Sequence, residues 1–370
     1  MSKYTLTTRD DCDDQRRKGL YRDIANKADG GRSPGENGSK LSAWLQLLRV
    51  PNLLTVPGDP IVGFFSWGSI RYFSPGAKAF VTIGEVAMLI PAVVSVLMLY
   101  CAGLVLNDLF DLNEDNRTRR HRPLPSGRIS VTSAVAVTVT FFVIGLAAAW
   151  FNGALCAGIA GVLSLSIVSY NAGAKRIPII GPLNMGLCRG LSVFMGLAIT
   201  SSLGLGPDST STLLTSDKLS MLLTWPFYSI TPLILYIAAI SLIASRETKS
   251  VRMLIQPWLP ATVVAVWMFC LAQQAIGGDS PVGGAALVII AGLPVVMTLV
   301  AGWRLKGTPS PKTVQLAVGE LIGALLLIQA AAVYFNSYWT NSRAEALPLA
   351  IALGAAYPVF IFLCRRFYAS

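Results

Sequence analysis

Apolar and polar residues alternate along this chain in long blocks. From about residue 43 to the end, apolar stretches of about 20 residues recur, and charged residues gather in the short segments between them. A helix of about 20 apolar residues can cross the roughly 30 Å hydrocarbon core of a bilayer. Backbone groups in lipid must be bonded within the chain, so these stretches are predicted to be helices.

The pattern predicts an all-α fold, a polytopic transmembrane bundle of about nine to ten spans. The count is nine if the last stretch lies on the membrane surface. The predicted spans are 43–68, 83–106, 130–151, 153–171, 179–201, 225–244, 257–276, 284–303, 316–336 and 346–364. Pro57 and Gly58 are expected to break the backbone ladder locally within the first of them.

The domain organisation follows from the same pattern. Residues 1–40 are polar and contain no apolar run, so they are predicted to be a disordered tail. Residues 41–370 are predicted to form a single transmembrane domain. Only 13% of the residues are charged, against about 25% in an ordinary soluble domain, which argues against a soluble protein.

The basic residues set the expected orientation. Of the 30 Lys and Arg residues, 25 fall on the side of the N-terminal tail, 4 fall on the other side and Arg189 falls within a span. The positive-inside rule therefore places the N-terminus in the cytoplasm. The net charge of +11 reflects this topology, so we expect contact with membrane lipid and no nucleic-acid partner.

Three aspartates stand where the second span leaves the membrane. Asp108, Asp111 and Asp115 are three and four residues apart, which places their carboxylates on one face of a helix, with Asn107 at its edge. Carboxylates so close together repel one another unless a cation lies between them. Mg²⁺ prefers such oxygens and usually takes one or two carboxylates together with substrate phosphates.

Arginines follow the aspartates at once and suit the remaining oxygens of a diphosphate. They are Arg117, Arg119, Arg120, Arg122 and Arg128. The alternative interpretation is a solvated loop that obeys the positive-inside rule. That interpretation explains the arginines, but it does not explain the acidic residues.

The stretch Asn107–Gly127 reads N-D-x-x-D-x-x-x-D followed by R-P-L-P-S-G, and it resembles the first signature of the UbiA family of intramembrane prenyltransferases. Arg49 and Asn52 resemble the family's Arg-Pro-x-Asn segment, and Tyr170 with the following Lys-Arg resembles its Y-x-x-x-x-K-R. The resemblance extends over about residues 43–337.

The resemblance implies a helical bundle around a central cavity that binds Mg²⁺ and a prenyl diphosphate donor. It implies ionisation of the donor and attack by a hydrophobic acceptor, with the site on the cytoplasmic side. Asp108, Asp111 and Asp115 would be catalytic and bind the metal. The expected diphosphate-binding residues are Asn107, Arg117, Arg119, Arg122, Lys175, Arg176, Arg246, Arg49, Asn52 and Tyr170.

The chain departs from the family after the sixth span, where a second motif of the form D-x-x-x-D is expected. Glu247 is the only acidic residue there. One expectation is that Glu247 holds a second metal ion together with waters. The other is that Arg246, Lys249 and Arg252 supply the positive charge of that second metal ion. Leu242–Glu247 and Cys188–Gly190 resemble the divergent EboC-like branch.

Three functions follow for this pocket. The first is transfer of a prenyl group to a small aromatic or lipid acceptor. The alternatives are cyclisation of the isoprenoid, as in some relatives, and non-catalytic binding or carriage of a prenyl phosphate because the second motif is degenerate.

Ionisable residues also lie within the predicted spans, where each is costly in hydrocarbon. They are Asp59, Arg189 and Glu320. Either Asp59 or Glu320 belongs to an acceptor site, or one of them forms a buried pair with Arg189 that fixes helix packing.

Overall fold

Prolines and a glycine divide the start of the bundle into short helices. The computed structural model describes residues 40–72, 83–203, 226–247, 252–276, 284–339 and 343–368. The first predicted span consists of α2 (Lys40–Leu47), α3 (Val50–Leu53) and α4 (Gly58–Tyr72). The expected break before Gly58 is present. A second break at residues 48–49 corrects the prediction of one span over 43–68. The predicted tail, 1–40, lies outside the described residues except for Lys40.

The remaining helices follow the predicted apolar stretches closely. They are α5 (Ile83–Ala87), α6 (Leu89–Phe110), α7 (Leu112–Thr118), α8 (Val131–Trp150), α9 (Ala154–Ala172), η1 (Ala174–Arg176), α10 (Ile180–Leu203), α12 (Pro226–Ala244), η3 (Gln256–Trp258), α13 (Leu259–Ile276), α14 (Gly284–Arg304), α15 (Pro311–Trp339) and α16 (Arg343–Tyr368). The predicted all-α class is confirmed. Within the described residues, β pairing is limited to one bridge between Met253 and Gly307.

Six of the described helical segments are long and apolar enough to cross a membrane. They are Ile83–Phe110, Val131–Trp150, Ala154–Ala172, Ile180–Ile199, Pro311–Ser337 and Ala344–Arg366. Two shorter apolar helices, Ser229–Ala244 and Ile289–Arg304, add to them. The chain is therefore an integral membrane protein, and the count of nine to ten crossings stays a prediction.

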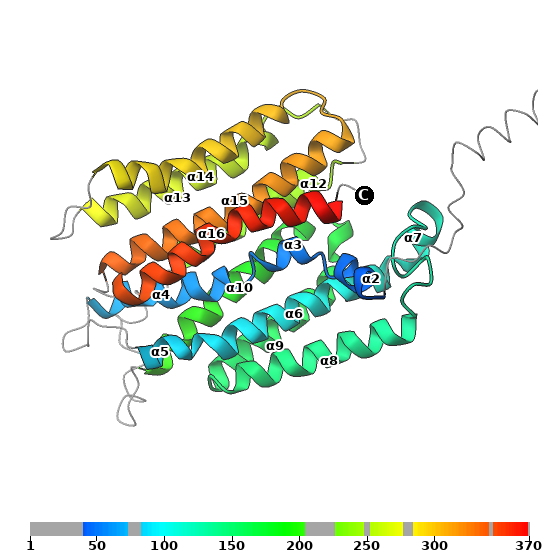
Figure 1. Ribbon diagram of the computed structural model, residues 1–370, viewed down its shortest axis with the longest axis horizontal. Coiled ribbons are helices and arrows are strands. Elements are labelled where there is room, and N and C mark those ends of the chain that lie inside the picture. The colour runs from blue at the N-terminus through cyan, green and yellow to red at the C-terminus, as the bar shows by residue number, and fades with distance from the viewer. Residues whose placement is uncertain are drawn as a thin grey trace, which may run out of the picture. The chain divides into compact units, whose positions relative to one another are not determined.

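The helices from Trp44 onward run side by side (Figure 1), and α4 packs against both α10 and α15. The α4–α10 contact is very close. A Cβ on Gly63 would lie 1.9 Å from the Val193 carbonyl oxygen, and a Cβ on Gly196 would lie 1.9 Å from that of Pro60. Glycines at both positions therefore allow the two backbones to touch, as small residues do in membrane helix pairs.

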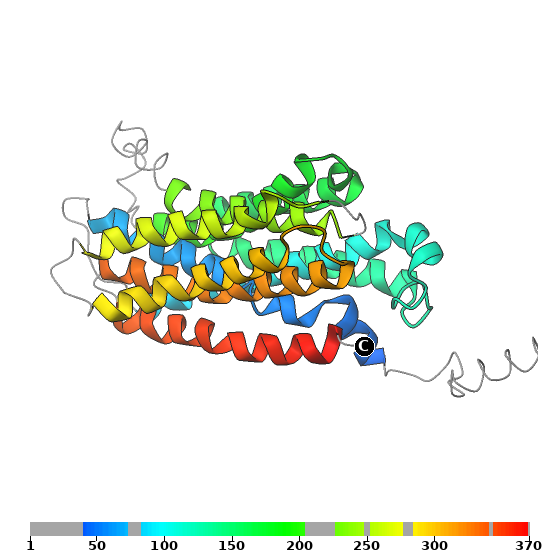
Figure 2. The same ribbon diagram turned by 90° about the horizontal axis from the view of Figure 1, so that it is seen from above.

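The outer helices present apolar side chains away from the bundle. On α8, the exposed residues include Val131, Val135, Val139 and Val143, which are spaced four apart and so form one stripe. Figure 2 shows α16 along the outside of the bundle, next to α15. These exposed apolar faces suit contact with lipid.

The helices alternate in direction, which brings several of their ends together where α6 and α7 meet. We call this the motif end. It also holds the end of α9 and the start of α10, the end of α12, and the start of α15 (Figure 1). Segments far apart in sequence are thereby brought to the same place as the aspartates.

Candidate active site

The aspartate motif runs through the joint between α6 and α7. Asp108 lies in the last turn of α6, Asp111 occupies the joint and Asp115 lies in α7. The Asp111 N–H donates to the Asn107 carbonyl at 3.0 Å, and the Asp115 N–H donates to the Asp111 carbonyl at 2.8 Å. The backbone thus stays nearly helical through the joint. Asp108 and Asp115 are buried, and Asp111 is partly exposed.

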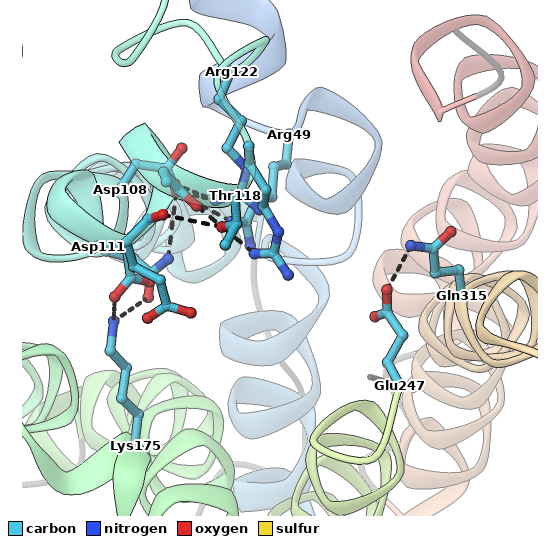
Figure 3. A network of polar contacts seen from close by, with 12 residues as sticks. Arg49, Asp108, Asp111, Thr118, Arg122, Lys175, Glu247 and Gln315 are labelled. Atoms are coloured by element: carbon cyan, nitrogen blue, oxygen red, sulfur yellow. Dashed lines mark hydrogen bonds and ion pairs between the residues drawn. The ribbon is translucent and has the colours of Figure 1, made fainter. Parts of the chain in front are cut away.

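Arg122 connects the two buried aspartates. Its Nη1 lies 2.7 Å from Asp115 Oδ2 and 3.8 Å from Asp108 Oδ1. Arg122 belongs to the turn after α7, where its carbonyl accepts the N–H of Ser126 at 3.0 Å. The R-P-L-P-S-G segment therefore folds back onto the acidic segment, and one guanidinium lies close to two carboxylates. Figure 3 shows Arg122 beside Asp108.

Arg49 reaches Asp108 from the start of the bundle. Its Nη2 lies 3.3 Å from Asp108 Oδ1. Arg49 precedes α3 with φ 47° and ψ 54°, in the left-handed region that a non-glycine residue adopts at a cost. The strained backbone is thus at a residue that contacts the motif, as strain often is at functional sites.

Lys175 contacts the motif from the turn after α9. Its Nζ lies 2.5 Å from Asp111 Oδ1 and 3.1 Å from Asn107 Oδ1. Figure 3 shows Lys175 rising toward Asp111 from η1, on the side of the motif away from Arg122. Two oxygens, one from the last turn of α6 and one from the joint that follows it, therefore point at one cationic atom.

These oxygens suit a divalent cation chemically. Asn107 Oδ1 and Asp111 Oδ1 already converge on the Lys175 ammonium, and hard oxygens of this kind are the ligands Mg²⁺ prefers. In the arrangement described, no three His, Cys, Asp or Glu side chains of the described residues are close enough to hold a metal together. Lys175 would have to turn aside for a metal to take its place.

Glu247 lies on the other side of the motif end. Its Oε1 accepts a hydrogen bond from Gln315 Nε2 of α15 at 2.5 Å. Figure 3 shows this pair apart from the aspartates. Arg246, just beyond the end of α12, is partly buried. The role of Glu247 as a metal ligand stays a prediction.

The other residues predicted from sequence lie at different distances from the aspartate motif. Arg119 Nη1 is 3.9 Å from Asp115 Oδ1. Tyr170, half-buried at the end of α9, lies within range of electrostatic interaction with Arg49 and Asp111. Arg117 and Arg176 are exposed to solvent.

Asn52 belongs to α3, close behind Arg49. Its side chain lies beside Tyr100 of α6. Both residues of the Arg-Pro-x-Asn resemblance therefore contact α6, the helix that carries the start of the aspartate motif.

The ionisable residues within spans are paired. Asp59 Oδ2 lies 2.8 Å from Arg189 Nε and both residues are buried, so the predicted Asp59–Arg189 pair is present. Glu320 pairs with Arg304 of α14 instead of Arg189. Sequence reasoning missed Gln329, whose Nε2 donates to Asp59 Oδ1 at 2.7 Å. A polar residue in the apolar run of α15 was the available signal.

A bundle of apolar helices with carboxylates and cations gathered at one end defines an intramembrane protein with a charged site at one end of its helices. The chain belongs to the UbiA prenyltransferase family, whose model matches residues 72–318. The resemblance seen in the motifs is thus confirmed.

Named relatives share parts of this chain. The digeranylgeranylglyceryl phosphate synthase of Methanoregula boonei is 43% identical over 86 residues, which are 23% of this chain and 31% of that protein. The enzyme of the same name from Saccharolobus solfataricus is 27% identical over 156 residues, 42% of this chain and 51% of that protein. The matched part of the chain therefore spans only a third to a half of these curated relatives.

A solved structure supports the fold. A UbiA homologue from Aeropyrum pernix K1, in its apo form, is 16% identical and covers 76% of this chain and 96% of that chain, with a TM-score of 0.53. At this identity the likeness concerns the fold alone.

Proposed function

We propose that this protein is a Mg²⁺-dependent intramembrane prenyltransferase. It moves an isoprenoid group from an allylic diphosphate to a hydrophobic acceptor, either a small aromatic compound or a lipid. The observation that carries this proposal is the convergence of Asp108 and Asp111 with Arg49, Arg122 and Lys175. These residues come from four segments of the chain, so the fold itself assembles the site.

The proposed roles follow from charge. Asp108, Asp111 and Asp115 supply carboxylates for Mg²⁺, with Asn107 adding a neutral oxygen. The cations paired with these carboxylates can turn to the phosphate oxygens of the donor, where guanidinium groups bind in bidentate fashion. Arg117, Arg119, Arg176 and Arg246 would add to the positive potential around the site.

The proposed reaction breaks the allylic C–O bond of the donor. The electron pair leaves with the diphosphate, the acceptor forms a bond to the allylic carbon, and the acceptor loses a proton. A bound metal would supply charge neutralisation of the departing diphosphate. Once turned to the phosphate oxygens, Arg49, Arg122 and Lys175 would stabilise the same developing charge.

The names of the relatives narrow the acceptor to test first. Both describe the synthesis of a glyceryl phosphate that carries two geranylgeranyl groups. An isoprenoid-bearing glyceryl phosphate is therefore a candidate acceptor beside small aromatic compounds. Such a lipid would reach the motif end from the membrane.

A second candidate function is non-catalytic binding of a prenyl phosphate. It is favoured by Glu247, the only acidic residue of its loop, whose carboxylate is bonded to Gln315 apart from the aspartates. A site with one acidic motif holds less metal charge and stabilises a leaving diphosphate less.

The test is incubation of the purified protein with Mg²⁺ and geranylgeranyl diphosphate, with and without a lipid extract. Diphosphate release and products are followed by mass spectrometry. We expect release that needs the extract and falls about a hundredfold or more with Asp111→Ala or with excess chelator, because metal neutralisation is worth several kcal/mol. Glu114→Ala is the matched control, since Glu114 is an exposed acid of the same segment.

The outcomes separate the three functions. Release without extract, with a cyclic product, would indicate cyclisation. Mg²⁺-dependent binding without release would indicate a carrier. Full turnover by Asp111→Ala would reject the proposed site.

A further inference from the structure

The break between α3 and α4 leaves one buried carbonyl without its helical partner. In a continuous helix the Thr55 carbonyl would accept the N–H of Asp59. Here the Asp59 N–H donates to Val56 instead, at 3.3 Å, because α3 ends at Leu53 and α4 begins at Gly58. Thr55 is buried, so its carbonyl needs another donor.

Two side chains from different parts of the bundle supply that donor. Arg189 Nη2 of α10 and Gln329 Nε2 of α15 each donate to the Thr55 carbonyl at 2.9 Å. Asp59 Oδ1 accepts from the same two nitrogens, at 3.1 Å and 2.7 Å. We call Asp59, Arg189 and Gln329 the buried triad.

A chain of hydrogen bonds runs from this carbonyl back to the motif end. Thr55 donates to the Asn52 carbonyl twice, from its N–H at 3.1 Å and from Oγ1 at 2.8 Å. The Asn52 N–H in turn donates to the Arg49 carbonyl at 2.8 Å. Each link joins residues three apart, so α3 is a single rigid turn whose far end is Arg49.

Arg49 holds a left-handed backbone conformation and contacts Asp108. Such a conformation persists only when its surroundings fix it. The close glycine contacts already hold α4 against α10, so helix packing alone does not call for a triad at the break. Arg189 and Gln329 hold the Thr55 carbonyl, two residues beyond the end of α3, and Asp59 holds both of these donors.

We infer that the buried triad consists of positioning residues, which act through the Thr55 carbonyl to fix Arg49 and Asn52 for binding of the donor diphosphate. This inference rests on the proposed function. It also gives the second half of the bundle a part in the site, because Gln329 of α15 donates to the Thr55 carbonyl in the link between α3 and α4. The triad thereby connects α10 and α15 to the link between α3 and α4.

The test measures binding of inorganic diphosphate with Mg²⁺ to the full-length purified protein by titration calorimetry. Gln329→Met keeps the length of the side chain and removes the donor, and we expect the Kd to rise roughly three- to tenfold. Thr55→Val, which is nearly isosteric and cuts the bond from Oγ1 to Asn52, should act in the same direction and serves if the first variant folds poorly.

The matched control is Asn336→Leu. Asn336 is also buried on α15 and donates to an α4 side chain, Ser66 Oγ at 3.0 Å, but it lies away from α3. We expect thermal stability to fall in the control as in Gln329→Met, with the Kd of the control unchanged.

A double variant distinguishes positioning from general destabilisation. If the triad acts through Arg49, Gln329→Met changes the Kd less in an Arg49→Ala background than in the native one. Equal fold-changes in both backgrounds, or a native Kd in both Gln329→Met and Thr55→Val, would overturn the inference alone. No binding by the native protein would overturn the proposed function, and the inference with it.

Discussion

Lys175 determines how much charge Asp111 presents at the surface of the site. Its ammonium lies 2.5 Å from the carboxylate, and both side chains are mostly shielded from solvent. The Lys175 ammonium therefore competes with any metal ion for the oxygens of Asp111 and Asn107. The same lysine would help a diphosphate to bind, so its effects on the two ligands should have opposite signs.

Replacement of Lys175 by Met should therefore tighten binding of the metal alone and weaken binding of diphosphate. We expect the Kd of Mn²⁺, used as a spectroscopic substitute for Mg²⁺, to fall about tenfold, because a repelling charge is removed from the oxygens. Electron paramagnetic resonance measures the Mn²⁺ affinity, and calorimetry measures that of diphosphate. Arg176→Met is the control of equal charge, and a similar gain there would argue against direct competition.

Among the residues, sequence analysis identified the aspartates and their cations but not how they pair. Lys175 and Asp111 are 64 positions apart, and their contact depends on where α9 ends beside α6. An ion pair between Asp59 and Arg189 was one of the predicted alternatives, whereas Gln329 was not among the residues predicted to contact Asp59. Spacing along the chain predicts which side chains share a helix face, and it carries no information on the side chains that other helices bring to that face.

At the scale of elements, the apolar stretches predicted the helices well. The predicted span 130–151 is α8 (Val131–Trp150), and 153–171 is α9 (Ala154–Ala172), because lipid requires backbone hydrogen bonds to close within each stretch. The break before Gly58 could be foreseen from Pro57. The break at Arg49 could not, since an arginine seldom adopts the left-handed conformation that it has here.

The crossing of α4 and α10 leads to a prediction at the same scale. Gly196→Ala should destabilise the bundle by about 1–3 kcal/mol, as overpacking does, because its Cβ would lie 1.9 Å from the Pro60 carbonyl oxygen. Thermal unfolding in detergent measures the change. Gly161→Ala is the control, because nothing lies within 4 Å of its Cβ, and it should unfold at the native temperature or higher. Equal stability of the two variants would contradict the close crossing.

At the scale of the whole molecule, the cations predict that the motif end faces the cytoplasm. Arg122, Lys175, Arg246 and Arg304 all lie at or beside helix ends of the motif end, as expected if the end is cytoplasmic. Family membership and the described helices establish a membrane protein.

Cysteine labelling in right-side-out vesicles tests this orientation. Ser126→Cys places a thiol in the turn between α7 and α8, and Phe151→Cys places one at the opposite end of α8, where Phe151 is exposed. An impermeant maleimide should label Phe151→Cys and should label Ser126→Cys only after the vesicles are opened. The native chain, with its own cysteines, provides the background. The reverse pattern would place the site outside the cell.

The pairing of each motif carboxylate with a cation of the same chain has a consequence beyond catalysis. Since Asp108, Asp111 and Asp115 are already neutralised by Arg49, Arg122 and Lys175, the fold does not need a bound ion to balance its acids. Under the proposed function, copies made while magnesium is scarce would accumulate folded but inactive. They would regain competence when the ion returns, with no fresh synthesis and no refolding.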